Sequence, residues 1–305
     1  MSTRIGINGF GRVGRQVASL EQVYRLVGRV GGSCEAEVHR AIRQNDGALV
    51  AVRVPTLRFP SKPELERMYA MFKEAAQTWW DLSNPKFGTP HPNIVQLVEY
   101  GLSPYPWLAL EYVGGGDLRE RLWPEPRSMS VQQSLEIAVQ ICDALGYAHC
   151  AGVVHRDVRP ENVLFTTGGV PKLSNLGAAR RFLDLPMMSF ETERAYSSPE
   201  NLSIPTQPGE VDQQADVFPM GILLYELFTG RYPFTDDGTL PDERSLQQCI
   251  TDPAYVPPCP STYRSGLPAG LDNVIMKALA KSRASRYYNG NQLRDELQRI
   301  ALERA

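Results

Sequence analysis

The stretch "HRDVRPENVLF", residues 155–165, gathers several chemically capable side chains within this 305-residue chain. Asp157 supplies a carboxylate, Arg159 a permanent cation and Asn162 an amide oxygen, and an apolar run follows them. A carboxylate can orient a hydroxyl group and accept its proton, and a nearby oxygen can hold a hard divalent cation. A solvent-exposed charged turn after a helix would have a similar composition, so the surrounding sequence has to decide between a site and a turn.

The residues before this stretch predict a sheet with one helix. Five short runs have the alternating or apolar character of strands, at residues 23–30, 36–42, 48–55, 94–101 and 107–113. Between the third and fourth runs, apolar residues recur at helical spacing from Leu65 to Trp79. We therefore expect a β-rich part that ends near Val113.

The residues after Val113 predict mainly helices. Ser130 and Gln133 have the spacing of a capping box before a long apolar stripe, and Gly152 is a typical helix stop. Further helices are expected at residues 216–229, 271–280 and 291–302. A β-rich part followed by a helical part predicts an α+β fold with two lobes and a cleft between them, where ligands often bind.

The composition argues against several classes of protein. A formal net charge of −2 gives no broad attraction to nucleic acid or to anionic membranes, so neither is expected as a partner. Five cysteines without a CxxC pair indicate neither a disulfide framework nor a zinc site, which favours the reducing cytoplasm. No apolar run approaches the roughly 20 residues that a membrane-spanning helix needs.

The opening stretch resembles the catalytic loop of protein kinases, H-R-D-x-x-x-x-N. Other landmarks of that family follow in order. "SSPE" at 197–200 resembles A-P-E, and "ADVFPMGILLYELFTGRYPF" at 215–234 resembles a helix that begins with a buried aspartate. The resemblance implies that Asp216 holds the backbone of the HRD turn and that Glu200 pairs with Arg286. The sequence "DVRPEN" is similar to the bacterial serine/threonine branch, whose usual sequence is D-L-K-P-E-N.

The resemblance spans roughly residues 24–302 and implies a bilobal protein-kinase-like fold. A kinase-like domain is expected over 24–303, divided into an N-lobe, a hinge and a C-lobe at residues 24–110, 111–116 and 117–303. ATP and Mg²⁺ are the implied cofactors, and a protein is the implied substrate or regulated partner.

The resemblance also assigns roles to individual residues. Asp157 would be the catalytic base, Arg159 the cation beside the transferred phosphate, and Asn162 a ligand of Mg²⁺. Asn175 occupies the second metal position. Nucleotide contacts are implied for residues of both lobes, namely Gly31, Val38, Ala51, Arg53, Glu74, Glu111, Val113, Asp117 and Leu164. For Asp117, a position before a leucine at a helix start is equally that of an N-cap.

Asn175 and Arg53 depart from the family pattern in charge or shape. Asn175, in "LSNLG", stands where the family has the aspartate that holds magnesium, and an amide offers the ion no net charge. Arg53, in "VAVR", replaces a lysine that bridges phosphate and a helix glutamate, here Glu74. Arginine keeps the positive charge and could pair with Glu74, but its planar fork is larger than an ammonium group.

The loop that should cover the phosphates has also lost glycines. In "VGGSCEAEV", Gly31 is the first glycine of the G-x-G-x-x-G pattern, but Ser33 and Ala36 occupy the other two positions. Side chains there stand where bare backbone normally meets phosphate. Glu193 replaces the usual threonine of the segment before Tyr196, which also makes normal docking of peptide substrates doubtful.

Three functions stay open. The leading hypothesis is a pseudokinase with weak or absent phosphoryl transfer, which acts as a regulatory or binding module. The second is an active serine/threonine kinase that transfers the γ-phosphate of ATP to proteins. The third, an NAD-binding oxidoreductase fragment, rests on "RIGINGFGRVGRQV", residues 4–17. Residues 3–17 resemble the N-terminus of glyceraldehyde-3-phosphate dehydrogenase, but Tyr24 already begins the first kinase strand. Residues 1–23 are therefore interpreted as a leader segment.

Overall fold

The computed structural model describes the chain at residues 20–32, 36–56, 62–86, 88–102, 105–122, 129–176, 194–203, 212–235 and 243–303. Most of the leader lies outside these residues, as do Ser33 and Glu193, so the predictions made for them are not addressed by the structure.

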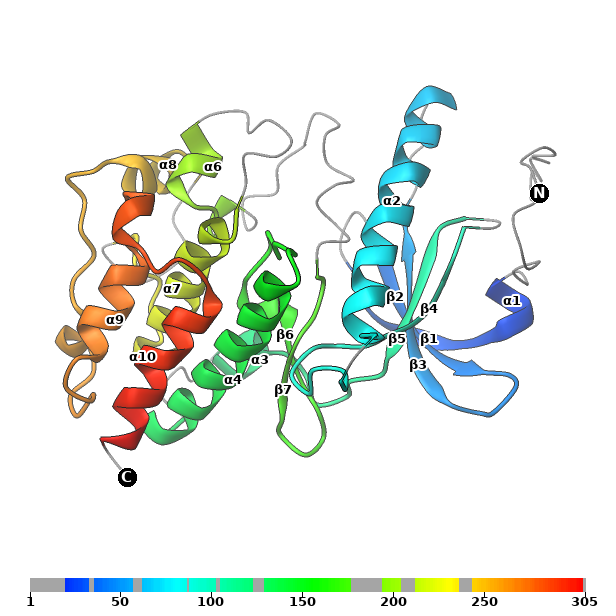
Figure 1. Cartoon of the computed structure of the whole chain (residues 1–305), viewed down its shortest axis with the longest axis horizontal. Helices are drawn as coiled ribbons and strands as arrows, with labels where there is room; N and C mark the ends of the chain where they lie inside the picture. Colours follow the sequence, from blue (N-terminus) through cyan, green and yellow to red (C-terminus); the bar gives the residue numbers. More distant parts are fainter. Residues whose placement is uncertain are drawn as a thin grey trace.

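The N-lobe is built on a sheet of five strands, as the sequence predicts. The strands are β1 (Tyr24–Gly32), β2 (Ala36–Arg43), β3 (Leu49–Pro55), β4 (Leu97–Gly101) and β5 (Trp107–Glu111). Their order is β1-β2-β3-β5-β4, and every neighbouring pair is antiparallel. The long helix α2 (Lys62–Ser83) lies alongside the sheet, and the single turn α1 (Leu20–Val23) precedes β1 (Figure 1).

The register of the first three strands brings four predicted nucleotide contacts to one face. Gly31 of β1 lies opposite Val38 of β2, which in turn lies opposite Arg53 of β3. Residues directly opposite one another in a sheet share a face, and so do residues two apart on one strand. Ala51 therefore lies on the same face as Arg53.

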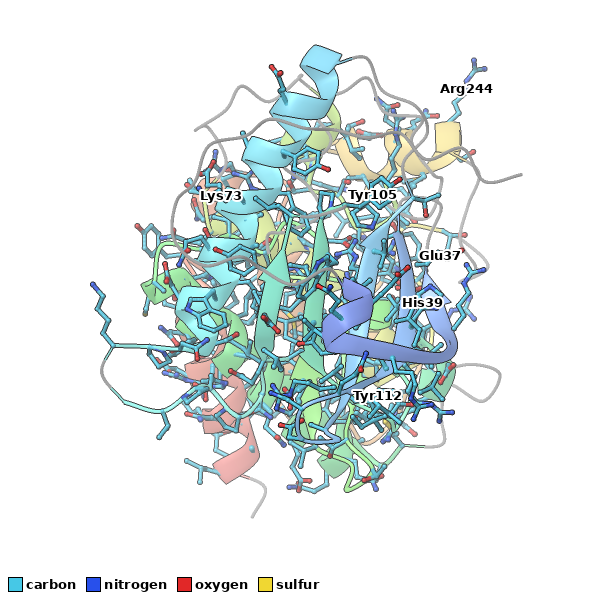
Figure 2. The ribbon with its side chains drawn as sticks, turned by 90° about the vertical axis from the view of Figure 1, so that its right-hand side faces the viewer. Glu37, His39, Lys73, Tyr105, Tyr112 and Arg244 are labelled. Atoms are coloured by element: carbon cyan, nitrogen blue, oxygen red, sulfur yellow. The ribbon has the colours of Figure 1, made fainter. Side chains whose placement is uncertain are left out.

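The two faces of the sheet bury different clusters. Side chains of alternate positions form a small core of Tyr24, Ala41, Val50, Val52, Trp107 and Ala109 on one face. The other face contributes Leu108 and Leu110 to the main core, together with Phe72 and Trp79 of α2. Figure 2 looks onto this end of the molecule, with Lys73 of α2 at one side and His39 at the other.

The C-lobe is mainly helical. Its described helices are α3 (Leu118–Leu122), α4 (Val131–Cys150), α6 (Pro199–Ser203), α7 (Gln214–Thr229), α8 (Glu243–Thr251), α9 (Leu271–Ala278) and α10 (Gly290–Leu302). The single-turn 3₁₀ helices in the described part of the C-lobe are η1 (Pro160–Asn162), η3 (Pro260–Thr262) and η4 (Arg283–Ser285). The short hairpin β6 (Val163–Phe165) and β7 (Pro171–Leu173) lies between the helices and the N-lobe sheet (Figure 1).

The long helix α4 begins and ends where the sequence predicts. Ser130 accepts from the backbone of Gln133, whose side chain accepts from the backbone of Ser130, so the capping box is present. Gly152, just after the helix, has φ +73°, a conformation that glycine adopts at little cost.

The predicted strand at residues 94–101 was too long at its start. Strand β4 begins at Leu97, because the backbone of Ile94 and Val95 pairs with Leu173 of β7 instead of with the sheet. This pairing connects the N-lobe to the C-lobe hairpin. Within the described ranges, no helix is long and apolar enough to cross a membrane.

Candidate active site

The HRD turn is fixed by a buried carboxylate, as the resemblance implies. Asp216, at the start of α7, is fully buried and accepts from the backbone N–H groups of His155 and Arg156, each at 2.7 Å. Its Oδ2 also lies 2.9 Å from His149 Nε2. Arg156 has φ +66°, a strained value for a residue with a side chain, and the bond to Asp216 helps to hold it there.

The side chain of His155 is buried beneath the HRD turn, and its imidazole ring is neutral. Burial lowers its pKa, although Asp216 and Asp157 oppose this effect. Its Nε2 lies 2.7 Å from the carbonyl oxygen of Ser174, which can only accept, so Nε2 carries the proton. Its Nδ1 accepts from the backbone N–H of Asp157. The ring thereby connects the catalytic loop to the residue before Asn175.

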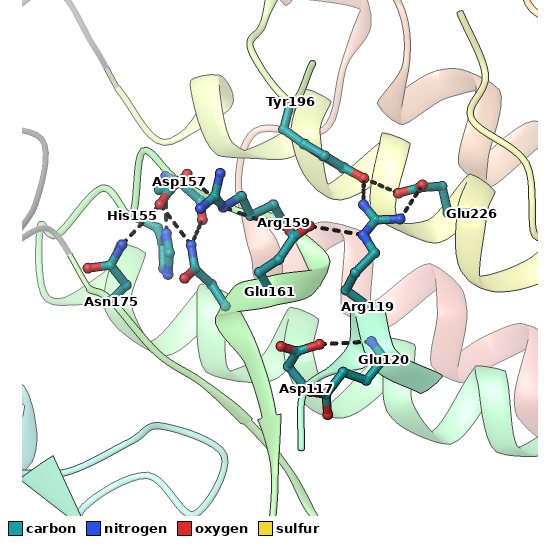
Figure 3. Close-up of polar contacts among 11 residues, drawn as sticks. Asp117, Arg119, Glu120, His155, Asp157, Arg159, Glu161, Asn175, Tyr196 and Glu226 are labelled. Carbon is teal, nitrogen blue, oxygen red and sulfur yellow. Dashed lines mark hydrogen bonds and ion pairs between the residues drawn. The ribbon is translucent and has the colours of Figure 1, made fainter. Parts of the chain in front are cut away.

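Asp157 is surrounded by donors. Its Oδ2 accepts from the side-chain amides of Asn162 at 2.8 Å and of Asn175 at 2.9 Å (Figure 3). Arg159 Nε lies 3.6 Å from its other oxygen, Oδ1. The structure therefore brings together all three predicted catalytic residues and the second predicted metal position.

Asn175 connects Asp157 to the N-lobe. Its Oδ1 accepts from Arg53 Nη1 at 2.6 Å, so the bond joins β3 to the segment after β7. The amide cannot turn over, because its NH₂ would then face a guanidinium and its oxygen a carboxylate. We call Arg53, Asp157, Asn162 and Asn175 the Asn175 cluster.

The predicted pair between Arg53 and Glu74 stays a prediction. Glu74 lies on α2 with an exposed side chain, and its carbonyl oxygen accepts from Thr78 within the helix.

The space next to Gly31 is open. A Cβ atom placed there would meet nothing within 4 Å, whereas Ala36 is buried at the start of β2. Glu37, which follows it, points its carboxylate toward His39 and Arg29 at one edge of the sheet (Figure 2). Only the first of the three glycine positions therefore presents bare backbone within the described part of this hairpin.

The hinge is held against the C-lobe by backbone pairing. Gly115 N donates to Phe165 O at 2.7 Å, and Phe165 N donates to Gly116 O at 2.9 Å. A Cβ on Gly115 would lie 2.5 Å from the Phe165 carbonyl oxygen, so only glycine fits. The same pairing sets Asp117 beside Leu164.

The side chains around the hinge have structural partners. Glu111 accepts from Lys172 of β7 at 2.7 Å and from the backbone of Gln96. Asp117 accepts from the backbone N–H of Glu120 at 2.9 Å and caps α3, which confirms its interpretation as an N-cap. Burial raises the pKa of Asp117, and the bond from Glu120 works against that effect.

Three apolar residues implied for the nucleotide have similar surroundings. They are partly buried against the main core and come from β3, the hinge and β6, namely Ala51, Val113 and Leu164. Contact of these residues, and of Val38 and Asp117, with a nucleotide stays a prediction.

The predicted pair between the SSPE motif and the end of the chain is present. Arg286 donates to both oxygens of Glu200, each at 2.8 Å, and its side chain is fully buried. Burial would raise the pKa of Glu200, but the bonds from Arg286 outweigh it and hold the pKa below its ordinary value. This pair fixes the segment that follows Tyr196.

A charged cluster beside the catalytic loop is absent from the sequence-based predictions. Arg119 of α3 donates to Glu161 at 2.9 Å, to Glu226 of α7 at 3.0 Å, and to the hydroxyl of Tyr196 (Figure 3). Burial and the nearby Glu226 raise the pKa of Tyr196, so its hydroxyl stays protonated and donates to Glu226. No sequence pattern joins residues so far apart in the chain, although Glu161 itself lies in the opening stretch.

The chain matches the protein kinase domain family over residues 24–296. It is 32% identical over 277 residues to the serine/threonine-protein kinase PknB of Mycobacterium tuberculosis, which covers 88% of this chain and 41% of that protein. A probable serine/threonine-protein kinase of Streptomyces coelicolor is 31% identical over 291 residues, or 92% of this chain and 41% of the relative. The chain thus spans about two fifths of the length of the curated relatives it matches.

The family match and the structure agree on architecture. The antiparallel N-lobe sheet, the helical C-lobe, the HRD turn held by Asp216 and the Glu200–Arg286 pair all occur where the family pattern expects them. With this fold, and with relatives of the bacterial serine/threonine type, the chain belongs to the protein kinase domain family.

Proposed function

We propose that this chain is a serine/threonine-type protein kinase domain with weak or absent phosphoryl transfer, which acts as a regulatory or binding module. The observation that carries the proposal is the pair of hydrogen bonds at the Asn175 amide, one to Asp157 and one from Arg53. In the family pattern this position holds the aspartate that binds magnesium.

The Asn175 cluster is a poor set of ligands for Mg²⁺, which the family generally uses together with ATP. Mg²⁺ prefers oxygen ligands about 2.0–2.1 Å away in near-octahedral geometry. The Asn175 oxygen instead lies 2.6 Å from a guanidinium nitrogen, and Asp157 Oδ2 already accepts from two amides.

Charge repulsion acts in the same direction. A divalent ion on the Asn175 oxygen would lie next to the Arg53 cation, and two unit charges about 4 Å apart repel by about 4 kcal/mol at an effective dielectric constant of about 20. Electrostatic stabilisation of the transferred phosphoryl group is a main source of catalysis in this reaction class. Each 1.4 kcal/mol or so of lost transition-state stabilisation lowers a rate about tenfold. A weakened metal site is therefore expected to make phosphoryl transfer very slow.

The second candidate is an active kinase, and the contacts among the catalytic-loop residues favour it. Arg159 and Asn162 each lie within contact distance of Asp157, and Asp216 holds the turn that carries Asp157. In that case Asp157 would accept the proton of a protein hydroxyl group, and Arg159 would lie beside the transferred phosphate.

The oxidoreductase alternative receives no support. All strand pairs of the N-lobe sheet are antiparallel, and the family match begins at residue 24. A dinucleotide-binding unit needs a parallel pair with a crossover helix.

The bounds of the domain, its location and its partner are also part of the proposal. We take the kinase-like domain as residues 24–303, in the cytoplasm, with a protein as its substrate or regulated partner. The support is the family match, together with the protein kinases among its relatives.

A phosphotransfer assay tests the proposal. Purified protein is incubated with radiolabelled ATP, Mg²⁺ and a general protein substrate, and the wild type is compared with Asp157→Ala. Both are expected to remain at background, with circular dichroism as a check on folding. Incorporation that the wild type shows and Asp157→Ala lacks would establish the active kinase instead.

A further inference from the structure

Arg53 is held between the lobes in an arrangement that suits phosphate. Its Nη1 donates to Asn175 at 2.6 Å, a charge-assisted bond that orients the side chain. A guanidinium carries its five N–H donors in a planar fork, so it can bind an amide oxygen and a phosphate oxygen at the same time.

The Asn175 cluster has less negative charge than the family pattern. Replacing an aspartate by Asn175 removes one negative charge, and Arg53 keeps the positive charge of the usual lysine. The carboxylate that remains, Asp157, accepts from Asn162 and Asn175. Because position 175 carries no negative charge, it does not repel phosphates that approach Arg53. No divalent ion is therefore needed there to screen such a repulsion.

Gly31 offers room for phosphates on the same face. The register places Gly31, Val38 and Arg53 in one row across the sheet, and a Cβ at Gly31 would meet nothing within 4 Å. An oxyanion can thus lie between Gly31 and the guanidinium, in contact with bare backbone on one side.

We propose that this site binds a nucleoside triphosphate as the free polyanion, without a divalent metal ion, and that Arg53 is the cation that binds its phosphates. The inference rests on the proposed function, because it specifies that a module with little or no phosphoryl transfer binds its nucleotide in the metal-free form. Mg²⁺ should oppose binding, since it complexes ATP in solution and brings a second cation toward Arg53.

Calorimetric titration with ATP tests the metal dependence. In buffer with EDTA the wild type should bind ATP, and excess MgCl₂ should weaken the affinity about threefold or more. An affinity that rises about tenfold with MgCl₂ would overturn the proposal. Absence of ATP binding in both buffers would also overturn it, although the proposed lack of phosphoryl transfer would stand.

Variants test the role of Arg53 itself. Arg53→Met should lose about tenfold or more of its affinity for ATP in EDTA. Arg299→Met, which removes an exposed arginine on α10, is the matched control and should bind like the wild type. Equal affinity of Arg53→Met and the control would contradict the proposal, provided that both melt cooperatively.

A second substitution keeps the test independent of the folding of Arg53→Met. Asn175→Asp restores the carboxylate, so ATP binding should become dependent on Mg²⁺. ATP binding by Asn175→Asp that MgCl₂ weakens as in the wild type would contradict the role assigned to Asn175. Metal-free binding by the wild type, together with measurable transfer in Mg²⁺, would support this inference and overturn the proposed function.

Discussion

The side-chain amide of Asn175 donates to the carboxylate of Asp157, with 2.9 Å between Nδ2 and Oδ2. An aspartate at position 175 would instead bring two like charges to this distance, and a proton or a bound cation would relieve their repulsion. Asparagine also tolerates the backbone conformation at this position, φ +64°, better than most residues. Asn175 thus forms a hydrogen bond to Asp157 where two carboxylates would repel each other.

The first prediction concerns the stability of Asn175→Asp. In EDTA the variant should lose about 1–2 kcal/mol of unfolding free energy, because a hydrogen bond is replaced by a repulsion. Excess Mg²⁺ should recover most of this loss, which urea denaturation in the two buffers will measure.

The control for this change is Asn273→Asp, at an exposed position of α9. It adds the same charge without a carboxylate neighbour of this kind, so its stability should respond to Mg²⁺ no more than that of the wild type. An Asn175→Asp protein as stable in EDTA as the wild type would show that the bond to Asp157 contributes little.

The second prediction concerns the pair of Glu200 and Arg286. Lysine cannot make the two parallel bonds of the arginine fork, so Arg286→Lys should cost about 1–3 kcal/mol of unfolding free energy. Arg299→Lys, where 58% of the side chain is exposed, should leave the denaturation midpoint unchanged. Equal midpoints for the two variants would show that the buried pair is dispensable for stability.

Much of the fold could be predicted because its signals are local. Strands β1, β2 and β3 follow short alternating runs, and α4 follows a capping box and an apolar stripe. Two long-range contacts were predicted only from the family resemblance: the pair of Glu200 and Arg286, and the bond of Asp216 to the HRD turn. Their residues are 86 and 61 positions apart, so no local sequence pattern connects them.

The parts that could not be predicted depend on contacts between distant segments. Strand β4 starts late because the backbone N–H of Val95 donates to Leu173 of β7 instead of to the sheet. The hydropathy pattern of residues 94–101 contains no information about this partner. Similarly, the bond from Arg53 to Asn175 depends on how the two lobes meet, and no sequence pattern indicates it. Sequence indicated the departure at position 175 but not the partners that compensate for it.

The third prediction uses the pH dependence of Asp216. Burial would raise its pKa, but the bonds from His149 and from the backbone of Arg156 outweigh it and hold the pKa below the ordinary value of 3.8. A carboxyl group whose pKa is lower in the folded state stabilises the fold when ionised. Its contribution should be complete above about pH 4 and should be lost as the pH falls through the folded-state pKa.

The Asp216→Asn variant isolates that contribution. The change leaves buried N–H groups without a charged acceptor and should cost about 2–4 kcal/mol at neutral pH. The difference from the wild type should shrink below pH 4 or so, as measured by urea denaturation across the pH range. Asp295→Asn, whose side chain is 62% exposed, is the control; a pH-independent difference for Asp216→Asn would contradict the assignment.

The fourth prediction concerns the ion pair between Glu111 and Lys172, which joins strand β5 of the N-lobe to strand β7 of the C-lobe at 2.7 Å. The lysine side chain is only 12% exposed, and the same carboxylate oxygen accepts from the backbone N–H of Gln96. Lys172→Met keeps the length of the side chain but removes its charge, so Glu111 should hold Gln96 less firmly. Hydrogen exchange at the amides of Gln96 and Glu111 should become faster by about fivefold, which corresponds to about 1 kcal/mol of lost protection.

The matched control for this pair is Lys73→Met, which removes an exposed lysine from α2. It should leave exchange at both amides unchanged, because it lies outside the connection between the lobes. Nucleotide binding gives a second measure of the same ion pair, since Glu111 begins the hinge and Lys172 lies on strand β7 of the β6–β7 hairpin. If the pair fixes the angle between the lobes, Lys172→Met should weaken ATP binding and Lys73→Met should not. Unchanged exchange at Gln96 in Lys172→Met would show that the backbone pairing of Val95 with Leu173 is sufficient to hold the lobes together.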